Sequence, residues 1–473
     1  MTTDVYDVLR ADYGLAEIRK HTNLIKLSQP ETNRRQAAML GFWNAYRDEF
    51  RERLFASRRE LDTWKLRQLQ RLVDWAYTTC PLYKSRFASA GYELGGIRSF
   101  RDFESLPILT RDDVISGYPG AIVSAGFDAS GCRLVGSSGS SGKQVQLIVE
   151  QDRADLDTLL KYRMFEHAGN FRLEADDWLY NVHHAPWWHT SMLGDYRVFS
   201  VTQDCCPENL VRHVALLRPK VISCTGSYLS KLAPTSCTLA KHGVALVSTN
   251  SESTTSRERM LAEAALGVPV RDEYSSEEID LIATECSAGR YHVVEDNAYV
   301  EILSPETNGT GAVVATDLWN RAMPMIRYDQ GDLAAWSSSP VRCACGSGFR
   351  QLSAVHGRAN DAFRTSTGAV ISPASVLHAV EEYFCMGDTG LNEFRVIQKT
   401  LFAIEVLFVG GERQQNFGAA IEGFSTHLSD LFGYRIDVKA VPVEALPPAP
   451  SYKRKTLFCE LAPGTLLDQG PES

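Results

Sequence analysis

Apolar residues in the first quarter of the chain recur at helical spacing. Between residues 62 and 77 they return every three or four positions, which predicts an amphipathic helix. Pro81 is expected to end this helix, because proline lacks the backbone N–H that a helix uses. A short helix is predicted to begin at Thr110, whose hydroxyl can accept a hydrogen bond from the first turn. Residues 1–56 are polar, carry charges of both signs and are also expected to be helical.

Short apolar runs alternate with helical patterns in the middle of the chain. The runs at residues 221–224 and 245–248 are typical of buried strands, and a helical pattern over residues 257–266 follows the second run. This alternation predicts α/β units with parallel strands. Further on, strand patterns at residues 299–303 and 311–316 predict a β-rich subdomain.

The last part of the chain repeats a βα pattern. Helical patterns over residues 373–383 and 416–431 enclose a strand pattern over residues 402–409. About 110 residues are enough for a small α+β domain. We therefore predict an α/β fold made of a helical extension over residues 1–56, a large domain over residues 57–361 that includes the β-rich subdomain at about 290–356, and a small mobile domain over residues 362–473.

Composition and charge exclude several classes of protein. The 473 residues include 49 Lys and Arg against 58 Asp and Glu, and a net charge of −9 argues against a nucleic acid as partner. No run of 18 apolar residues exists, so we expect no membrane-spanning segment. The start of the chain lacks the pattern of a signal peptide, and the 11 cysteines are an odd number in a chain too long to need disulfides. A reduced, cytoplasmic location is expected.

A glycine- and serine-rich segment precedes Lys143. Backbone N–H groups and hydroxyls of such a segment can surround phosphate oxygens, and the lysine adds a positive charge. It is not a Walker A loop, because five residues rather than four separate Gly136 from Gly142. A flexible linker is the alternative. The apolar runs at residues 132–135 and 145–149 favour a tight, hairpin-like loop instead.

Three further short motifs carry polar groups that suit a nucleotide. The acidic segment 272–278 follows an apolar run and could hold Mg²⁺ together with substrate phosphates, with a solvated loop as the alternative. Asp332 can accept hydrogen bonds from a ribose diol, or could stand in a turn. Arg358 and Asp361 belong to a segment that could likewise be a turn.

The four motifs occur together and in order, and with them the chain resembles the adenylate-forming superfamily, in particular its phenylacetate–CoA ligase-like branch. The resemblance extends from about Ser57 to Glu460 and includes Cys80-Pro81-Leu82-Tyr83 and the segment from Thr316 to Tyr328. It implies that ATP reacts with a carboxylic acid to give an acyl-adenylate and pyrophosphate. The acyl group, expected to come from an aromatic acid, then passes to a second nucleophile, for which coenzyme A is the expected molecule.

The resemblance also implies roles for individual residues. Lys143 would bind phosphate, Glu277 would hold Mg²⁺, and Lys453 would stabilise the carboxylate and the α-phosphate during adenylation. Asp361 would lie at the hinge between the large and small domains. The expected contacts of ATP are Ser137, Ser138, Gly139, Ser140, Ser141, Gly142, Tyr274, Ser276, Asp332 and Arg358.

The position of the C-terminal lysine leaves two alternatives. Tyr452 stands where the family usually has a glycine before this lysine, so Lys455 is the alternative to Lys453. A basic surface turn would explain the same residues without catalysis.

A set of cysteines and a histidine offers ligands for zinc. Thiolates and a neutral imidazole suit tetrahedral Zn²⁺, although the spacing of Cys286, His292, Cys343 and Cys345 matches no standard zinc knuckle. Some members of the branch carry a similar set that binds structural zinc. We expect a closed site that braces the β-rich subdomain and has no part in the chemistry; four unconnected residues are the alternative.

Residues 183–189 contain three histidines and two tryptophans. In the resembling family this region lies near the acyl pocket and is often a glycine/aromatic run, from which this chain departs. His183, His184, Trp187 and Trp188 are expected to line a pocket for a planar aromatic acid. A surface loop with its tryptophans packed on the core is the alternative.

Other functions remain open at this stage. The acceptor could be an amine, as in an amide synthetase, or the enzyme could activate nitrite toward an aryl amine. A non-catalytic nucleotide-binding relative is another class, but the presence of Glu277, Asp332 and Arg358 beside the phosphate loop argues against it. Residues 1–56 precede the resemblance and would pack either on the large domain or on a second subunit, as in a homodimer.

Overall fold

The computed structural model divides into two compact units, each with its own core. It describes residues 30–127, 132–136, 145–184, 187, 189–235, 237–252, 254–303, 309–338, 342–385, 391–410, 417–447 and 455–461. The N-terminal unit comprises Met1–Val300, Ala315–Tyr328 and Ser339–Gln351, and the C-terminal unit comprises Glu301–Val314, Asp329–Ser338 and Leu352–Ser473. The domain boundaries expected at residues 57 and 362 remain a prediction.

Helices of the N-terminal unit begin where the sequence offers capping groups. At the start of α6, Thr110 accepts a hydrogen bond from the N–H of Asp113 and gives its own N–H to that carboxylate, which confirms the predicted helix. Pro81 follows the end of α3 and begins α4, because proline at the first position of a helix loses no hydrogen bond. The first five described helices are α2 (Pro30–Arg53), α3 (Arg58–Thr79), α4 (Pro81–Ser89), α5 (Phe100–Glu104) and α6 (Arg111–Gly117).

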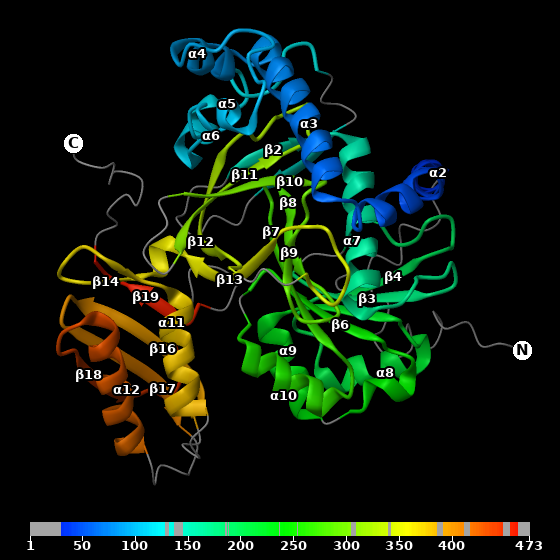
Figure 1. The fold of residues 1–473 in the computed structure, drawn as a ribbon. Helices are drawn as coiled ribbons and strands as arrows, with labels where there is room; N and C mark the ends of the chain where they lie inside the picture. The colour runs from blue at the N-terminus through cyan, green and yellow to red at the C-terminus, as the bar shows by residue number, and fades with distance from the viewer. Residues whose placement is uncertain are drawn as a thin grey trace, which may run out of the picture. The chain divides into compact units, whose positions relative to one another are not determined.

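Five parallel strands form the centre of this unit in the order β4-β3-β5-β6-β7, and β8 and β9 continue the sheet in antiparallel pairing. Alternate side chains of each strand face opposite sides. Leu179 packs in the core with α2 and α7, whereas Tyr180 packs in the core with α8, α9 and α10, and Figure 1 shows these helices on the two faces. The predicted parallel α/β units are therefore confirmed. The strands are β3 (Trp178–Val182), β4 (Arg197–Val201), β5 (Val221–Thr225), β6 (Leu246–Asn250), β7 (Val270–Ser276), β8 (Asp280–Glu285) and β9 (Tyr291–Val293).

Helices cover the sheet between these strands. Their bounds are α7 (Gln151–Gly169), α8 (Pro207–Leu217), α9 (Gly226–Leu232) and α10 (Ser256–Leu266), with 3₁₀ turns at Ala233–Thr235 and Leu239–His242. A separate hairpin pairs β1 (Arg133–Gly136) with β2 (Gln146–Val149), so that Gly136 lies opposite Gln146. This pairing confirms that the apolar runs on either side of the glycine-rich segment form a hairpin.

Four strands contribute residues to both units. They are β10 (Ala298–Leu303), β11 (Thr310–Asp317), β12 (Tyr328–Trp336) and β13 (Gln351–Arg358). Within the C-terminal unit, β12 and β13 pair antiparallel from Asp332↔Arg358 to Trp336↔Leu352. The strands predicted near residues 300 and 313 are thus confirmed.

The C-terminal unit also contains a four-stranded sheet of order β18-β17-β16-β19 and a small hairpin. Two helices pack on this sheet around Phe384 and Phe424, which are both at most 1% exposed. The predicted helix over residues 373–383 is shorter as an α-helix, because a π-turn at Glu381–Cys385 follows it. The elements are β14 (Phe363–Arg364), β15 (Val370–Ile371), α11 (Pro373–Val380), β16 (Leu391–Thr400), β17 (Ala403–Gly410), α12 (Phe417–Phe432), β18 (Asp437–Pro442) and β19 (Leu457–Cys459).

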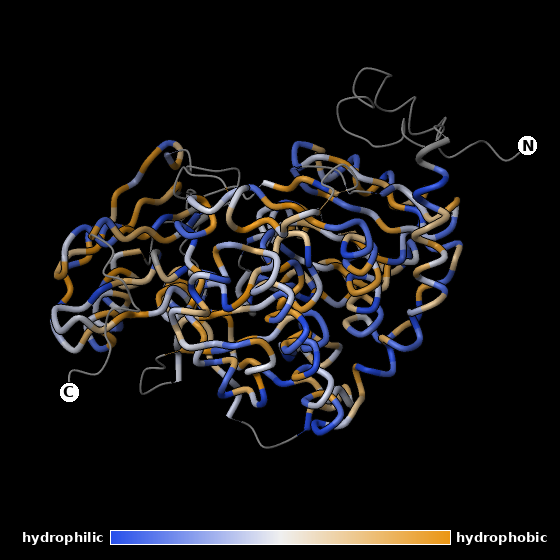
Figure 2. The backbone as a smooth tube through the Cα atoms, turned by 90° about the horizontal axis from the view of Figure 1, so that it is seen from above, coloured by the Kyte–Doolittle hydropathy of each residue, from blue (hydrophilic) through white to orange (hydrophobic). Residues whose placement is uncertain are grey.

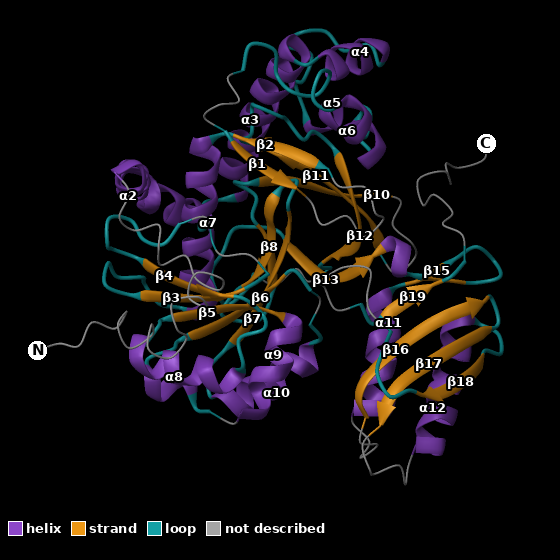
Figure 3. Cartoon of the chain, turned by 180° about the vertical axis from the view of Figure 1, so that it is seen from behind, coloured by secondary structure: helices purple, strands orange, loops and turns teal. Residues whose placement is uncertain are grey.

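Mixed layers of helix and strand agree with the predicted α/β class. Figure 3 shows helices beside the large mixed sheet and beside the small C-terminal sheet. Hydrophobic and hydrophilic stretches alternate along the backbone in Figure 2, as expected where each element buries one face. Among the described helices, none is both long and apolar enough to cross a membrane. The ten cysteines whose side chains the structure describes form no disulfide among themselves.

Candidate active site

The predicted phosphate loop lies outside the described residues. The two strands that flank it, β1 and β2, are described and place its ends next to each other. The expected roles of Lys143 and of the residues that precede it, Ser137, Ser138, Gly139, Ser140, Ser141 and Gly142, therefore stay predictions.

The acidic segment is partly inside the sheet rather than after a strand. Asp272 lies on β7, where Thr249 and Tyr291 donate hydrogen bonds to its two carboxylate oxygens. Burial raises the pKa of Asp272 to about 6, although Arg259 nearby opposes this shift. Glu285 accepts a hydrogen bond from the backbone N–H of Asp272 at 2.9 Å and so keeps a second carboxyl group close. Asp272 is therefore a hydrogen-bonded residue of the sheet and does not lie in a solvated loop.

The two glutamates after β7 differ in their surroundings. Glu277 is exposed at the turn that follows β7. The side chain of Glu278 is only 8% exposed, and its Oε1 accepts a hydrogen bond from the hydroxyl of Tyr328 at 3.3 Å and lies 3.9 Å from Nη1 of Arg111. Sequence reasoning singled out Glu277 alone. The structure adds Glu278 as a second carboxylate that could hold a cation.

Two predicted nucleotide contacts lie near this turn. Tyr274, on β7, is 9% exposed, so its ring is largely inside the unit. Ser276 ends the strand, and its Oγ accepts a hydrogen bond from the N–H of Ile279 at 3.2 Å, which closes the turn. Their predicted contacts with ATP stay predictions.

Asp332 and Arg358, predicted from separate motifs, are brought together in the C-terminal unit. They are cross-strand partners of β12 and β13, and Nε of Arg358 lies 3.2 Å from Oδ1 of Asp332. Arg358 also donates from Nη1 to the carbonyl of Gln330 at 2.8 Å. Gly331, which lies between Gln330 and Asp332 in the sequence, has a φ of 66°, a conformation that glycine adopts without strain. The pair presents one carboxylate and one guanidinium at the same place on the sheet.

Asp361 is held by one of the two candidate lysines. Its Oδ1 lies 2.7 Å from Nζ of Lys455, and this ammonium also lies 4.4 Å from the ring centroid of Phe458. Burial raises the pKa of Asp361, and the hydrogen bond from Lys455 opposes this shift. Lys453 lies outside the described residues. The ammonium of Lys455 therefore already has a carboxylate partner within its own unit.

The structure brings the four predicted zinc ligands together, as a metal site requires. Their ligand atoms all lie within 4.8 Å of one another, although they come from segments up to 59 residues apart along the chain (286 to 345). The Sγ atoms of Cys286 and Cys343 are 3.6 Å apart, and Sγ of Cys345 is 3.4 Å from Nε2 of His292. These are the only such cluster of His, Cys, Asp and Glu among the described residues.

The geometry of this set fits a tetrahedral zinc ion. Zn–S bonds of about 2.3 Å and Zn–N bonds of about 2.05 Å place two sulfurs about 3.8 Å apart and a sulfur and a nitrogen about 3.5 Å apart. Nδ1 of His292 lies 3.0 Å from the carbonyl of Phe349, which can only accept, so Nδ1 carries the proton and Nε2 is left as the metal-binding nitrogen. The hydrogen bond with Cys345 lowers the pKa of Cys286 to about 3, which favours a thiolate.

The histidine and tryptophan segment divides between surface and core. His183 and His184 follow β3, and His184 is exposed. Trp187 is stacked on His189 with ring centroids 5.5 Å apart, and it packs against the core on the α7 side. Trp188 lies outside the described residues. The packing of Trp187 on the core is the feature expected of the alternative, a surface loop, and the role of these residues in an acid pocket stays a prediction.

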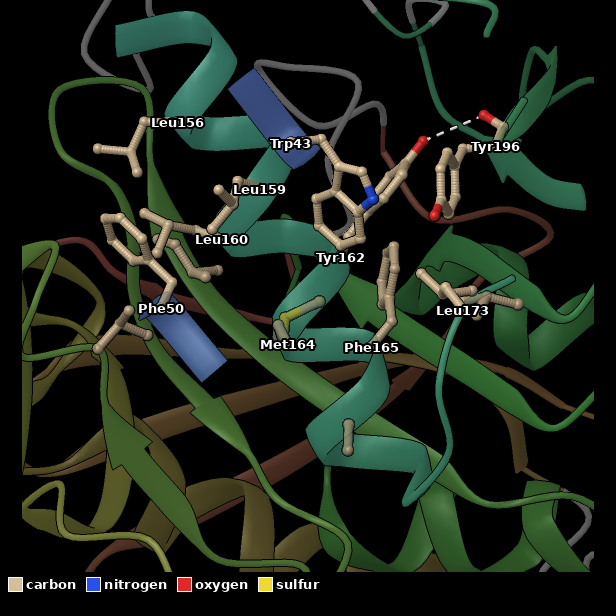
Figure 4. Close-up of a cluster of buried hydrophobic side chains, with 14 of the residues drawn as sticks. Trp43, Phe50, Leu156, Leu159, Leu160, Tyr162, Met164, Phe165, Leu173 and Tyr196 are labelled. Atoms are coloured by element: carbon tan, nitrogen blue, oxygen red, sulfur yellow. Dashed lines mark hydrogen bonds between the residues drawn. The ribbon is translucent and has the colours of Figure 1, made fainter. Parts of the chain in front are cut away.

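Sequence reasoning expected residues 1–56 to be helical but did not connect them with this segment, which α2 supports through Tyr162. Trp43 of α2 is 1% exposed, with ring centroids 5.5 Å from Tyr162 and 5.3 Å from Tyr196, and Figure 4 shows the three rings together. Gln36 of the same helix accepts hydrogen bonds from Oγ of Ser191 at 2.9 Å and from the N–H of residue 193 at 3.1 Å. Of the two alternatives for residues 1–56, the described part packs on its own unit.

Comparisons with known proteins identify relatives of the chain. No family model matches the chain. It is 26% identical over 329 residues to phenylacetate–coenzyme A ligase of Thermus thermophilus, and 26% identical over 330 residues to that of Pseudomonas putida. Each alignment covers 64% of this chain and 72% of the relative.

Solved structures show the same fold. A 2-hydroxyisobutyryl-CoA ligase in complex with 2-HIB-AMP is 18% identical, with a TM-score of 0.71 over 86% of this chain and 91% of that one. ATP-bound MatB of Rhodopseudomonas palustris is 15% identical, with a TM-score of 0.52 over 73% of this chain and 70% of that one. At these identities the likeness shows the architecture alone.

Proposed function

Because the chain belongs to the adenylate-forming acyl-CoA ligase superfamily, as a distant homologue of the phenylacetate–coenzyme A ligases, we propose that it joins a carboxylic acid to coenzyme A at the expense of ATP. The acid carboxylate attacks the α-phosphate, and pyrophosphate leaves. The thiol of coenzyme A then attacks the acyl carbonyl, and AMP leaves. The names of the homologues support an aromatic acid as substrate.

The observation that carries this proposal is the pairing of Asp332 with Arg358. Two residues chosen from separate motifs are cross-strand neighbours with an N–O distance of 3.2 Å. In the proposed role, Asp332 accepts hydrogen bonds from the ribose hydroxyls of ATP, and Arg358 holds that carboxylate in position.

Magnesium fits the carboxylates after β7. Carboxylate oxygens are the ligands that Mg²⁺ prefers, and Glu277 and Glu278 supply them next to each other. When bound, the ion would neutralise charge on the phosphates during the displacement. Tyr328 donates a hydrogen bond to the carboxylate of Glu278 and helps to orient it. Lys143 and Lys453 are proposed to bind the phosphates and the reacting carboxylate.

Zinc is proposed as a structural ion held by Cys286, His292, Cys343 and Cys345. Four protein ligands complete a tetrahedral shell and leave no position for substrate. The ion would tie the segment at residues 343–345 to strands β8 and β9.

The proposed function is tested by pyrophosphate release. The full chain is incubated with ATP, Mg²⁺ and a panel of aryl, alkyl and cinnamic acids, alone, with coenzyme A, and with amines, and the products are identified by mass spectrometry. Acid-dependent release with a thioester product is expected. Release with an amide, or only with nitrite and an aryl amine, would instead identify an amine-directed enzyme, and the absence of any acid-dependent release would contradict catalysis.

A further inference from the structure

The order of the parallel strands marks one end of the sheet as a ligand site. The chain passes from β3 outward to β4 and then crosses back to β5, so the strand order reverses between β3 and β5. In open α/β sheets, ligands bind outside the carboxyl ends of the strands at such a reversal. The rule uses no motif, and it selects the residues that follow Val182 and Thr225.

A hydrogen bond joins two strand ends across this position. His183 follows β3 and Ser251 follows β6, and β5 lies between these strands in the sheet (Figure 3). Nε2 of His183 lies 2.9 Å from Oγ of Ser251. The two side chains therefore meet at the carboxyl end of β5, where the strand order predicts the ligand.

Ser251 has a backbone conformation that is rare for its residue type. Its φ is 65°, in the left-handed region that few residues other than glycine adopt. Its hydroxyl donates to Oδ1 of Asn250 at 3.0 Å, and Nδ2 of Asn250 donates to Oγ of Ser223 at 3.0 Å. Backbone strain held in place by surrounding hydrogen bonds is concentrated at ligand sites.

The side chains of His183 and Ser251 present polar groups rather than a hydrocarbon surface to a ligand. An imidazole and a hydroxyl can each exchange their mutual hydrogen bond for one to a bound hydroxyl or amino group. A hydrocarbon tail can make no such exchange and would remove polar groups from water without replacing their hydrogen bonds. The side chains therefore discriminate in favour of a ligand that carries a hydrogen-bonding substituent.

We propose that the carboxyl ends of β3, β5 and β6 hold the tail of the acid, and that this tail carries a hydroxyl or amino group bound by His183 and Ser251. The inference rests on the proposed acid-activating function and specifies the class of acid. Unsubstituted arylacetates and benzoates are then poor substrates. His183 and Ser251 determine specificity and take no part in the displacement at phosphorus.

The test compares matched pairs of acids. Pyrophosphate release is measured for phenylacetate against 4-hydroxyphenylacetate, and for benzoate against hydroxy- and aminobenzoates with the substituent at each ring position. We expect at least one substituted acid to exceed its parent in kcat/KM by about tenfold or more, as in sites built to hydrogen-bond a substrate hydroxyl. His183→Leu and Ser251→Ala should each remove most of this advantage through the KM of the substituted acid, with the KM of ATP unchanged.

Controls separate recognition from folding. His378 is exposed on α11, so His378→Leu removes an imidazole elsewhere and should keep the preference. His183→Gln keeps a hydrogen-bonding side chain and should retain part of the preference for substituted acids. Binding of the same acids is also measured by calorimetry, without turnover.

Each outcome decides between the two proposals. If acids are activated but every parent acid equals or exceeds its substituted partners, the inference is wrong and the proposed function stands. If the preference survives both His183→Leu and Ser251→Ala, these residues do not cause it and the inference is equally wrong. If no acid stimulates pyrophosphate release, the proposed function is wrong, and calorimetry then shows whether substituted acids still bind through His183.

Discussion

Single side chains in the Cys/His cluster are arranged as if around an ion. The separations of 3.6 Å between two sulfurs and 3.4 Å between a sulfur and a nitrogen are close to those around a tetrahedral zinc ion, which would hold the cysteines as thiolates. We expect the purified protein to contain about one zinc ion per chain, measured by plasma mass spectrometry. Cys286→Ser should lower this content and the melting temperature together.

The matched control is Cys206→Ser, because Cys206 is exposed and lies outside the cluster. This variant should keep both the zinc and the melting temperature. A folded wild-type protein that contains no metal would contradict the zinc site.

Asp272 makes the stability of the protein depend on pH. Burial raises its pKa to about 6, whereas an aspartate in an unfolded chain has a pKa of about 3.9. Between these values the folded state binds the extra proton, so this residue lowers the free energy of unfolding as the pH rises. The two pKa values correspond to a loss of about 3 kcal/mol, complete above pH 6.

The pH effect is measured by urea unfolding of wild type and Asp272→Asn from pH 4 to pH 7. The stability of the variant relative to wild type should rise across this range, because asparagine does not ionise. Asp430→Asn, at an exposed position on α12, should show no such trend. A constant difference between wild type and Asp272→Asn would contradict the raised pKa.

Substitution of each glutamate after β7 by glutamine shows which of the two binds the magnesium ion. If Glu278 holds the magnesium ion, Glu278→Gln should lower kcat/KM for ATP by about tenfold or more at limiting Mg²⁺, since it removes a charged interaction of roughly 1.5–3 kcal/mol. Glu277→Gln, one residue away and exposed, is compared under the same conditions and should have the smaller effect. The reverse order of effects, measured by pyrophosphate release, would return the role to Glu277.

At the scale of elements, α2 is part of the N-terminal unit and not an appendage. Trp43 contacts Tyr162 of α7, and Arg51 of α2 donates a hydrogen bond from Nε to Glu166 of α7 at 2.8 Å. Truncating a buried tryptophan costs about 3–5 kcal/mol. Trp43→Ala should therefore lower the free energy of unfolding by about that amount, measured by denaturant titration.

Tyr46 provides the control on the same helix. It is 42% exposed, so Tyr46→Ala removes an aromatic ring with little buried area and should change stability by less than about 1 kcal/mol. Equal losses in the two variants would mean that α2 does not contribute through Trp43.

Elements marked by a short sequence pattern could be predicted, whereas contacts between distant positions could not. Thr110 with Asp113 is a capping pattern contained within four residues, so the start of α6 could be read directly. The contact of Trp43 with Tyr162 joins positions 119 residues apart, and no periodicity marks it. His183 and Ser251 meet only because β3 and β6 have one strand between them, and strand order does not follow from spacing.

At the scale of the whole molecule, the motifs predicted family and class better than they predicted mechanism. Asp332 and Arg358 were found because each belongs to a recognisable segment, and their antiparallel strands then made them neighbours. Glu278 was missed because Glu277 has the same chemistry one position earlier. Burial and the hydrogen bond from Tyr328 separate the two, and both depend on tertiary structure.

The two C-terminal lysines are expected to affect the two half-reactions differently. Lys455 is already paired with Asp361, so its charge is directed to the predicted hinge and not to a phosphate. We therefore predict that Lys453 is the lysine for adenylation. Lys453→Ala should slow acyl-adenylate formation by about a hundredfold, the lower end of the range for lost electrostatic stabilisation of a transition state. It should change thioester formation from supplied acyl-adenylate little.

Lys455→Ala is the matched variant, two residues away in the same basic segment. Lys455→Ala removes the ammonium that lies 2.7 Å from the largely buried carboxylate of Asp361 at the predicted hinge. Its effect should therefore reach both half-reactions to a similar extent. Both rates are measured by rapid quench, with acyl-adenylate formation and consumption followed separately. A loss confined to adenylation in Lys455→Ala, with Lys453→Ala near wild type, would move the catalytic role to Lys455 and require another partner for Asp361 during that step.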